Sequence, residues 1–169
     1  ISATTRSVFE GTSDYSYGMF RLDGKTVAVI GAGSGIGRAV AMGAAGQGAL
    51  VSCLDVNTEN AAATAQSITA AGGKATSGPC DITDLTSVRD ALVEAASASS
   101  RLDGVVCTPA INVRKPILQY TTEEFLRVVD VNLKGNFHVL QAAGQLMTMQ
   151  GSGSIVLFSS IRSLVTEPG

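Results

Sequence analysis

The sequence predicts an α/β fold in which a doubly wound parallel sheet carries helices on both faces. Three observations predict it. Five short apolar runs alternate with helical segments in βαβαβαβαβ order, a glycine cluster follows the first run, and an aspartate ends the second. Strands that alternate with helices form parallel sheets with both faces covered. In doubly wound order, the first strand lies between the second and the fourth.

The predicted strands are short, and most are rich in Val, Ile and Leu, as in strands that are buried on both faces. The third is the weakest, because Lys, Thr, Ser and Gly make up most of it. The strands are expected at residues 25–31, 50–54, 74–78, 104–107 and 154–158.

Helix start and stop signals separate these strands. Good helix formers occupy residues 38–47. Asn57 is placed to cap an Ala-rich helix, which the glycine pair at 72–73 ends. A third helix is expected over residues 84–99, with an apolar stripe on one side.

A capping box marks the start of the longest predicted helix. Thr121 is followed three residues later by Glu124, and the helical pattern continues to Met149. His138, the only histidine, lies inside this helix. We interpret it as a packing or interface residue rather than a general base, because the spacing suggests no nearby Ser or carboxylate partner.

Length and composition limit the function classes. The 169 residues suit one domain, and with 45% hydrophobic and 15% charged residues the chain can bury a core. The net charge of −2 argues against nucleic-acid binding through a broad basic surface. No apolar run reaches the roughly 18 residues of a membrane span. We expect a flexible polar arm over residues 1–18 and one domain over 19–169, incomplete at its C-terminus.

Three cysteines, Cys53, Cys80 and Cys107, are spaced at equal intervals, each near the end of a predicted strand. The odd count indicates reduced thiols and therefore a cytoplasmic protein. A shared metal site is the alternative, but the sequence has no Cys-x-x-Cys pair or Cys/His cluster, so we expect no metal.

The glycine cluster lies where a strand passes into a helix. Glycines let a backbone turn tightly and approach a diphosphate, while the helix N-terminus offers free N–H groups. A plain strand–helix turn is the alternative, but such a turn seldom needs four glycines in seven residues. The predicted cofactor-binding residues of this loop are Gly31, Gly33, Ser34, Gly35, Ile36 and Gly37.

Asp55 ends the second predicted strand, at the position from which a carboxylate binds the ribose hydroxyls of a dinucleotide. A carboxylate there repels a 2′-phosphate, and neither Val56 nor Asn57 offers a compensating positive charge. The sequence therefore favours NAD over NADP, with Val56 beside the cofactor. The alternative is a helix-capping role for Asp55, which Asn57 could fill equally well.

Asp81 and Ile82 follow the third predicted strand, at the edge where ligands of such sheets bind. Asp81 is placed to accept a hydrogen bond from an adenine amino group. A turn-forming role for Asp81 fits the sequence as well, and both interpretations stay open.

Several motifs occur together in a fixed order: IGAGSGIG, then Asp55, CDI at 80–82, DVNLKG at 130–135 and GSIVLFSS at 153–160. This set resembles the short-chain dehydrogenase/reductases over about residues 19–169. The resemblance implies a Rossmann-like subunit that uses a nicotinamide cofactor. It further implies hydride transfer to or from a small alcohol or carbonyl compound, such as a sugar, a polyol or a related hydroxy compound.

The resemblance also implies site residues. Asn132 matches the asparagine that holds a water and the catalytic lysine, and Ser160 matches the serine that binds the reacting oxygen. Ser159 is the other candidate for that serine. Cys107 begins the segment that replaces the family's usual Asn-Asn-Ala-Gly, so only backbone contacts to the cofactor are expected there. Those contacts are expected at Thr108, Pro109 and Ala110.

The family's Tyr-x-x-x-Lys motif is not among the 169 residues, so we expect the chain to continue past Gly169. A truncated, catalytically inactive dinucleotide-binding module is the alternative. A methyltransferase is another, because its sheet also combines a glycine loop with an acid. The resemblance further implies a homo-oligomer, a dimer or tetramer, formed through the helix from Thr121 to Met149.

Overall fold

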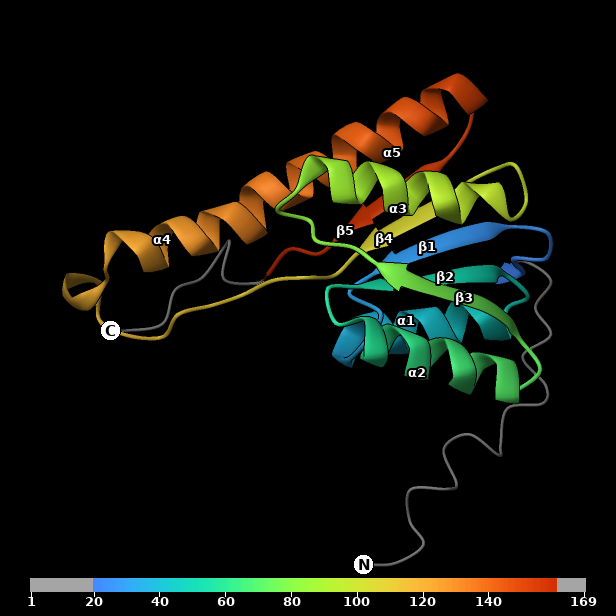
Figure 1. Ribbon diagram of the computed structural model, residues 1–169, viewed down its shortest axis with the longest axis horizontal. Helices are drawn as coiled ribbons and strands as arrows, with labels where there is room; N and C mark the ends of the chain where they lie inside the picture. Colours follow the sequence, from blue (N-terminus) through green and yellow to red (C-terminus); the bar gives the residue numbers. More distant parts are fainter. Residues whose placement is uncertain (1–19, 161–169) are drawn as a thin grey trace, which may run out of the picture.

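A computed structural model of the chain describes residues 20–160, which contain one five-stranded parallel sheet in the order β3-β2-β1-β4-β5 (Figure 1). This order confirms the predicted doubly wound α/β fold with the first strand at the centre. The predicted N-terminal arm lies outside the described residues. The strands are β1 (Thr26–Ile30), β2 (Leu50–Asp55), β3 (Lys74–Pro79), β4 (Gly104–Cys107) and β5 (Ser154–Leu157).

Helices cover both faces of the sheet. On one face lie α1 (Gly35–Gly46) and α2 (Thr58–Ala70), and on the other lie α3 (Leu85–Ser97) and α5 (Asn136–Gln150) (Figure 1). The predicted start of the first helix, at Arg38, is three residues too late, because the last glycines of the loop form its first turn.

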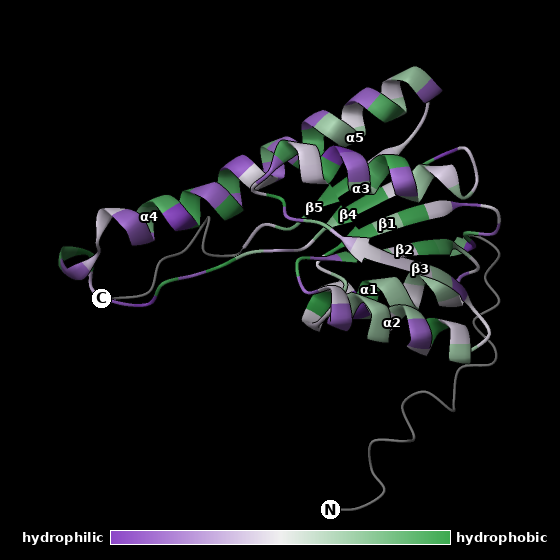
Figure 2. Ribbon diagram, viewed as in Figure 1, coloured by the Kyte–Doolittle hydropathy of each residue, from purple (hydrophilic) through white to green (hydrophobic). Residues whose placement is uncertain are grey.

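Two apolar clusters, one on each face of the sheet, make up the core. All five residues of β1 are buried, and most residues of the central strands β1 and β2 are apolar (Figure 2). Val29 and Val51 pack toward α1 and α2, whereas Ile30 and Val105 pack toward α3 and α5. Strand β3, at the edge, is mostly exposed, which accounts for its weak apolar signal.

The predicted helix from Thr121 to Met149 is interrupted. It consists of α4 (Thr122–Val129), a π-helical segment η3 (Asp130–Gly135) and α5. The capping box is confirmed, since Thr121 Oγ1 accepts from the Glu124 N–H and Glu124 accepts from the Thr121 N–H. In a π-helix, backbone hydrogen bonds join residues five apart instead of four, and such segments are common at functional sites.

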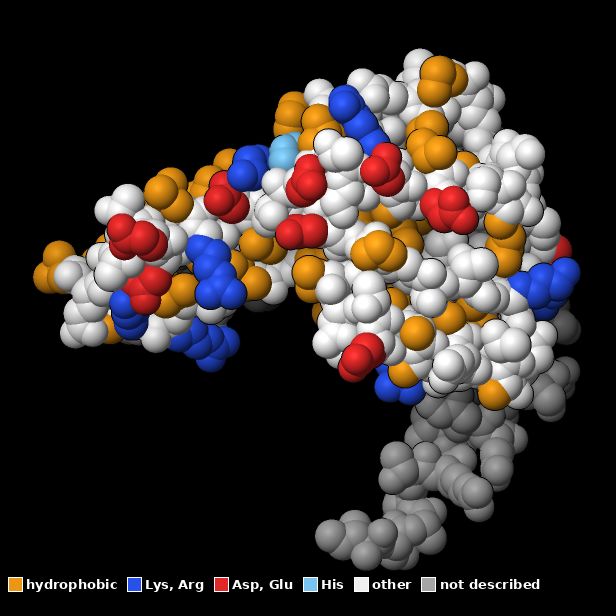
Figure 3. Space-filling model, in the orientation of Figure 1, with side chains coloured by type: hydrophobic (Ala, Val, Ile, Leu, Met, Phe, Trp, Pro, Cys, Tyr) orange, Lys and Arg blue, Asp and Glu red, His pale blue; other side chains and the backbone are white. Residues whose placement is uncertain are grey.

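Helix α4 projects beyond the edge of the sheet, and none of its residues is buried (Figure 1). Phe125 and Leu126 are each at least half exposed. Around α4, apolar side chains lie at the surface among charged ones (Figure 3). Within residues 20–160, no helix combines the length and the apolar character needed to cross a membrane.

Asp103 joins the amino ends of β1 and β4, at the end of the sheet opposite the glycine loop. Its carboxylate accepts a hydrogen bond from the Thr26 N–H at 2.9 Å and pairs with Lys25 at 3.2 Å and with Arg101. Partial burial opposes the charged form, but the bonds from Arg101, Thr26 and Lys25 outweigh it and lower the pKa of Asp103 to about 2.

We expect Asp103→Asn to lower the free energy of unfolding by about 1–2 kcal/mol at pH 7, after allowance for solvent screening. A carboxyl whose pKa falls on folding stabilises the protein above its ordinary pKa, near 4. That stabilisation is lost as the pH falls toward the folded value of about 2. Urea unfolding at pH 7 and pH 3 should therefore show the difference between variant and wild type shrinking in acid.

The matched control is Asp23→Asn, which breaks an exposed ion pair to Arg21. Solvent screens such pairs, so this variant should unfold like the wild type at both pH values. An Asp103→Asn protein that is as stable as the wild type at pH 7 would refute the role given to the carboxylate.

Candidate functional site

The carboxyl ends of the five parallel strands meet at one edge of the sheet, and the predicted site residues follow them there. The glycine loop follows β1, Asp55 ends β2, and Asp81 comes shortly after β3. The chain continues from β4 into Thr108 and from β5 toward Ser160. From β1 the strand order runs to β2 and β3 on one side and to β4 and β5 on the other. The direction of the chain across the sheet therefore reverses at β1, and ligands of such sheets bind at the carboxyl end of this switch point.

The backbone of the loop requires glycine at defined points. Gly31 has φ +84° and Gly35 has φ +51°, a left-handed conformation that side chains rarely adopt. A Cβ at Gly37 would lie 2.0 Å from the carbonyl oxygen of Gly31, so only glycine lets α1 approach the loop this closely. The N–H groups in the first turn of α1 have no partners within the helix, and the Ser34 side chain makes no capping bond.

Asp55 contacts the loop directly. Its Oδ2 accepts a hydrogen bond from the Gly33 N–H at 2.8 Å, and its Oδ1 accepts from the Asn57 N–H at 2.9 Å. Asn57 itself caps α2 by accepting from the Asn60 N–H at 3.0 Å. The capping role is thus taken by Asn57, and the Asp55 carboxylate lies at the carboxyl edge of the sheet, bonded to the glycine loop.

Two threonine hydroxyls hold carbonyl groups of the loop. Thr108 Oγ1 donates to the Ile30 carbonyl at 3.0 Å, and Thr64 Oγ1, on α2, donates to the Ala32 carbonyl at 2.9 Å. The ring of Pro109 packs over Gly31. From the sequence, Thr108 is expected in the site through its backbone, and no role is expected for Thr64. The sequence does contain one signal for Thr64, because it is a polar residue among the apolar positions on one side of an Ala-rich helix.

The remaining predicted contacts differ in exposure. Val56 is 74% exposed and Ile36 60% exposed, so both are available to a ligand at the edge, and Ala110 is exposed as well. Asp81 accepts from both the backbone N–H and the hydroxyl of Thr83, which is the turn-forming arrangement. This bond occupies one carboxylate oxygen, Oδ1.

Ile82 fixes the long helical segment against the sheet edge. Its side chain is buried and lies where a Cβ on Gly135 would come within 2.7 Å of it. His138 Nδ1 lies 2.9 Å from the Ile82 carbonyl oxygen, in hydrogen-bond contact. This contact joins His138 to the chain before α3, and its role as a packing or interface residue stays a prediction.

Asn132 lies in the π-helical segment and binds the chain that follows β4. Its Oδ1 accepts from the Ile111 N–H at 2.9 Å, and its Nδ2 donates to the Ile111 carbonyl at 2.8 Å. The Asn132 carbonyl in turn accepts from the Asn136 side chain at 2.8 Å. The Asn132 side chain thus positions the loop past β4, and its role toward a water or lysine stays a prediction. So does that of Ser160, which is exposed beyond β5.

The cysteines do not form a metal site. Cys53 packs toward α1 and α2, whereas Cys80 and Cys107 pack on the opposite face of the sheet. Burial raises the pKa of Cys53 to about 11 and those of Cys80 and Cys107 to about 12. Within residues 20–160, no group of three or more His, Cys, Asp or Glu side chains is arranged to hold a metal ion.

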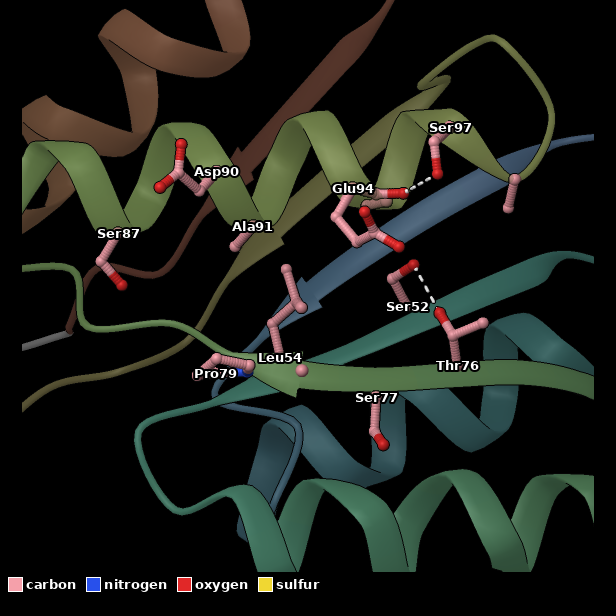
Figure 4. Close-up of a pocket in the computed structure, with 13 residues that line it drawn as sticks. Ser52, Leu54, Thr76, Ser77, Pro79, Ser87, Asp90, Ala91, Glu94 and Ser97 are labelled. Carbon is pink, nitrogen blue, oxygen red and sulfur yellow. Dashed lines mark hydrogen bonds between the residues drawn. The ribbon is translucent and has the colours of Figure 1, made fainter.

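A hollow of about 420 Å³ lies on the α3 side of β2 and β3, away from the glycine loop (Figure 4). Small side chains line it, with Asp90 and Glu94 of α3 at its rim. The hydroxyls of Ser52 and Thr76 in its floor lie 3.0 Å apart and bond to each other. In the described part of the chain, no buried side-chain nitrogen or oxygen lacks a hydrogen-bond partner. Nothing in this hollow therefore calls for a ligand.

Comparison with solved structures finds the same fold in dehydrogenases. A short-chain type dehydrogenase/reductase from Mycobacterium marinum superposes with a TM-score of 0.85 at 32% identity, covering 89% of this chain and 61% of that one. A 7α-hydroxysteroid dehydrogenase, solved with NADH and 7-oxo glycochenodeoxycholic acid, gives a TM-score of 0.82 at 30% identity, covering 87% of this chain and 57% of that one.

Sequence relatives agree. D-threitol dehydrogenase of Mycolicibacterium smegmatis is 35% identical over 141 residues, 83% of this chain and 54% of the relative. The chain thus spans about half the length of the curated relative it matches. The family model described as short chain dehydrogenase matches residues 25–169, which leaves the methyltransferase alternative without support. On the strength of this match, the chain belongs to the short-chain dehydrogenase/reductase family.

Proposed function

We propose that this protein is a nicotinamide-dependent oxidoreductase acting on a small alcohol or carbonyl compound. The observation that carries the proposal is the contact at the carboxyl edge of the sheet, where the Asp55 carboxylate accepts a hydrogen bond from the Gly33 N–H beside the open first turn of α1. Family membership and the similarity to D-threitol dehydrogenase support a polyol, sugar or related hydroxy compound as substrate.

The residues present fit a dinucleotide. A Cβ at Gly33 would come within 2.8 Å of Asp55 Oδ2, and one at Gly37 would collide with Gly31, so the loop packs this closely only with glycine at both positions. A Cβ at Gly35 would meet no atom within 4 Å, so the loop is open at that position. Backbone N–H groups of the first turn of α1 would bind the diphosphate, and Asp55 would bind the ribose hydroxyls. Because a carboxylate repels a 2′-phosphate, we propose a preference for NAD over NADP.

When bound, the nicotinamide supplies hydride transfer, and the chain supplies position and electrostatics. Ser160 would donate a hydrogen bond to the reacting oxygen, whose negative charge grows during reduction. Asn132 would keep the loop after β4 in place through its paired bonds to Ile111. Proton transfer in this family is assigned to the Tyr-x-x-x-Lys motif, which is not among the 169 residues.

We also propose a homo-oligomer formed through α4, η3 and α5. The apolar side chains on this surface are exposed in the single chain, and burying them would favour association. They are Phe125, Leu126, Leu133, Phe137, Leu140 and Met149. The three buried free thiols support a reducing compartment, so we propose the cytoplasm.

Titration of the chain with NADH and NADPH, followed by cofactor fluorescence, tests the proposed function. We expect NADH to bind at least about tenfold more tightly than NADPH. Asp55→Ala should weaken NADH binding by about tenfold or more, because hydrogen bonds to a charged group are lost. The same variant should also reduce the difference in affinity between NADH and NADPH, because the charge that repels the 2′-phosphate is gone.

The control is Asp90→Ala, which removes the same charge from the exposed surface of α3. It should leave both affinities unchanged. A wild-type chain that binds neither cofactor would overturn the proposed function. An Asp55→Ala chain that binds NADH as tightly as the wild type would remove Asp55 from the site.

A further inference from the structure

Thr64 is a buried polar residue on the apolar side of α2. Its side chain is 1% exposed and lies in a stripe with Ala61, Ala65 and Ile68, which are also buried. A threonine in this position often bonds only to the carbonyl four residues earlier in its own helix. Thr64 does contact the Asn60 carbonyl, at 3.1 Å, but its shorter bond, at 2.9 Å, leaves the helix for the Ala32 carbonyl of the glycine loop.

The peptide group between Ala32 and Gly33 is consequently held at both ends. Its C=O accepts from the Thr64 hydroxyl, and its N–H donates to Asp55 Oδ2 at 2.8 Å. The preceding N–H of Ala32 donates to the Leu54 carbonyl at 3.0 Å. Two fixed ends leave this peptide a single orientation, and in that orientation it binds Asp55 Oδ2 while the Asn57 N–H binds Asp55 Oδ1.

From this geometry we infer that Thr64 is a positioning residue for dinucleotide binding. Its hydroxyl holds the Ala32–Gly33 peptide so that Asp55 and the phosphate-facing loop keep their binding geometry before the ligand arrives. This inference rests on the proposed function for its ligand.

The cost of losing the hydroxyl follows from burial. Ala32 is 0% exposed, so its carbonyl has no access to water from its present position. Without the Thr64 donor, the carbonyl is left without this partner in an apolar setting, which is unfavourable. Rotating the peptide toward solvent relieves that cost but turns the Gly33 N–H away from Asp55. Part of the binding free energy must then be spent on restoring the loop.

Thr64→Val tests the inference, because valine keeps the shape and branching of threonine and removes only the hydroxyl. We expect the Kd for NADH to rise about tenfold in Thr64→Val and to return to within about twofold of wild type in Thr64→Ser. In a catalytically complete enzyme, the variant should raise KM for the dinucleotide and leave kcat at saturation unchanged.

The matched control is Thr69→Val on the same helix. Thr69 donates only to the Ala65 carbonyl within α2, at 3.0 Å, and does not contact the loop. This variant makes the same side-chain change at an exposed position of the same helix and should bind NADH like the wild type. Equal weakening of NADH binding in Thr64→Val and Thr69→Val would show that the effect comes from helix stability, and it would overturn the inference.

Amide hydrogen exchange gives a readout that needs no ligand. The Gly33 N–H should exchange faster in Thr64→Val than in the wild type, and at the wild-type rate in Thr64→Ser and Thr69→Val. Unchanged Gly33 exchange in Thr64→Val would overturn the inference whether or not NADH binds. If the wild type fails to bind NADH while Gly33 exchange responds as expected, the positioning of the loop stands and the proposed function falls.

Discussion

Gly37→Ala should lower the free energy of unfolding by about 3 kcal/mol and weaken NADH binding by at least about a hundredfold. The added Cβ would lie 2.0 Å from the Gly31 carbonyl oxygen, 2.5 Å from its carbonyl carbon and 2.7 Å from Thr108 Oγ1. Two of these atoms are backbone and cannot rotate away. Helix α1 or the loop must therefore shift, and either movement separates the groups that would hold the diphosphate. Urea unfolding and NADH titration measure the two effects.

Gly43→Ala is the control for this prediction. Gly43 lies in the same helix, and a Cβ there would meet no atom within 4 Å. Because alanine favours a helix over glycine, this variant should be as stable as the wild type or more stable by about 0.5–1 kcal/mol. Equal stability and equal NADH affinity of Gly37→Ala and Gly43→Ala would contradict the close approach of α1 to the loop.

The second large effect concerns the reaction itself. In an enzyme that carries this chain together with a Tyr-x-x-x-Lys motif, Ser160→Ala should lower kcat by about a hundredfold, as loss of one oxyanion donor does elsewhere. The reason is that the lost hydrogen bond strengthens as charge develops on the reacting oxygen. The Kd for NADH should stay near the wild-type value, because the serine is assigned to the substrate. Steady-state assays on a panel of polyols and sugars give kcat.

Ser159→Ala separates the two serines that follow β5. If Ser160 binds the reacting oxygen, Ser159→Ala should retain kcat within about threefold of wild type. A hundredfold loss in Ser159→Ala with normal turnover in Ser160→Ala would transfer the role to Ser159. Normal turnover in both variants would remove the serine pair from the mechanism.

The sheet could be predicted because its signals are local. Every strand except the polar edge strand β3 is a short apolar run between polar turns, and the position of the glycine loop and of Asp55 indicated the central strand. The conformation of residues 130–135 could not be predicted in this way. The sequence DVNLKG fits an ordinary helix, and the π-helical segment coincides with tertiary contacts, between Gly135 and Ile82 and between Asn132 and Ile111. Such contacts are invisible to helical periodicity.

For the candidate site, as for the sheet, the sequence predicts where the residues lie but not all of their contacts. The sequence places Asp55 and the glycines at one edge, because parallel strands bring their carboxyl ends together. It left open whether Asp55 caps α2, and the bonds of Asn57 and Asp55 decide that question. The role of Thr64 depends on a contact across 32 residues of chain, which no local pattern encodes.

The central claim is that a dinucleotide binds with its diphosphate at the first turn of α1 and its ribose at Asp55. A crystal structure of the chain soaked with NADH tests it most directly. The account predicts diphosphate density within hydrogen-bond distance of the backbone N–H groups of residues 34–37, and ribose hydroxyls bonded to the Asp55 carboxylate. Density for NADH at another surface would contradict it, and so would the absence of NADH from the first turn of α1 and Asp55 at saturating NADH.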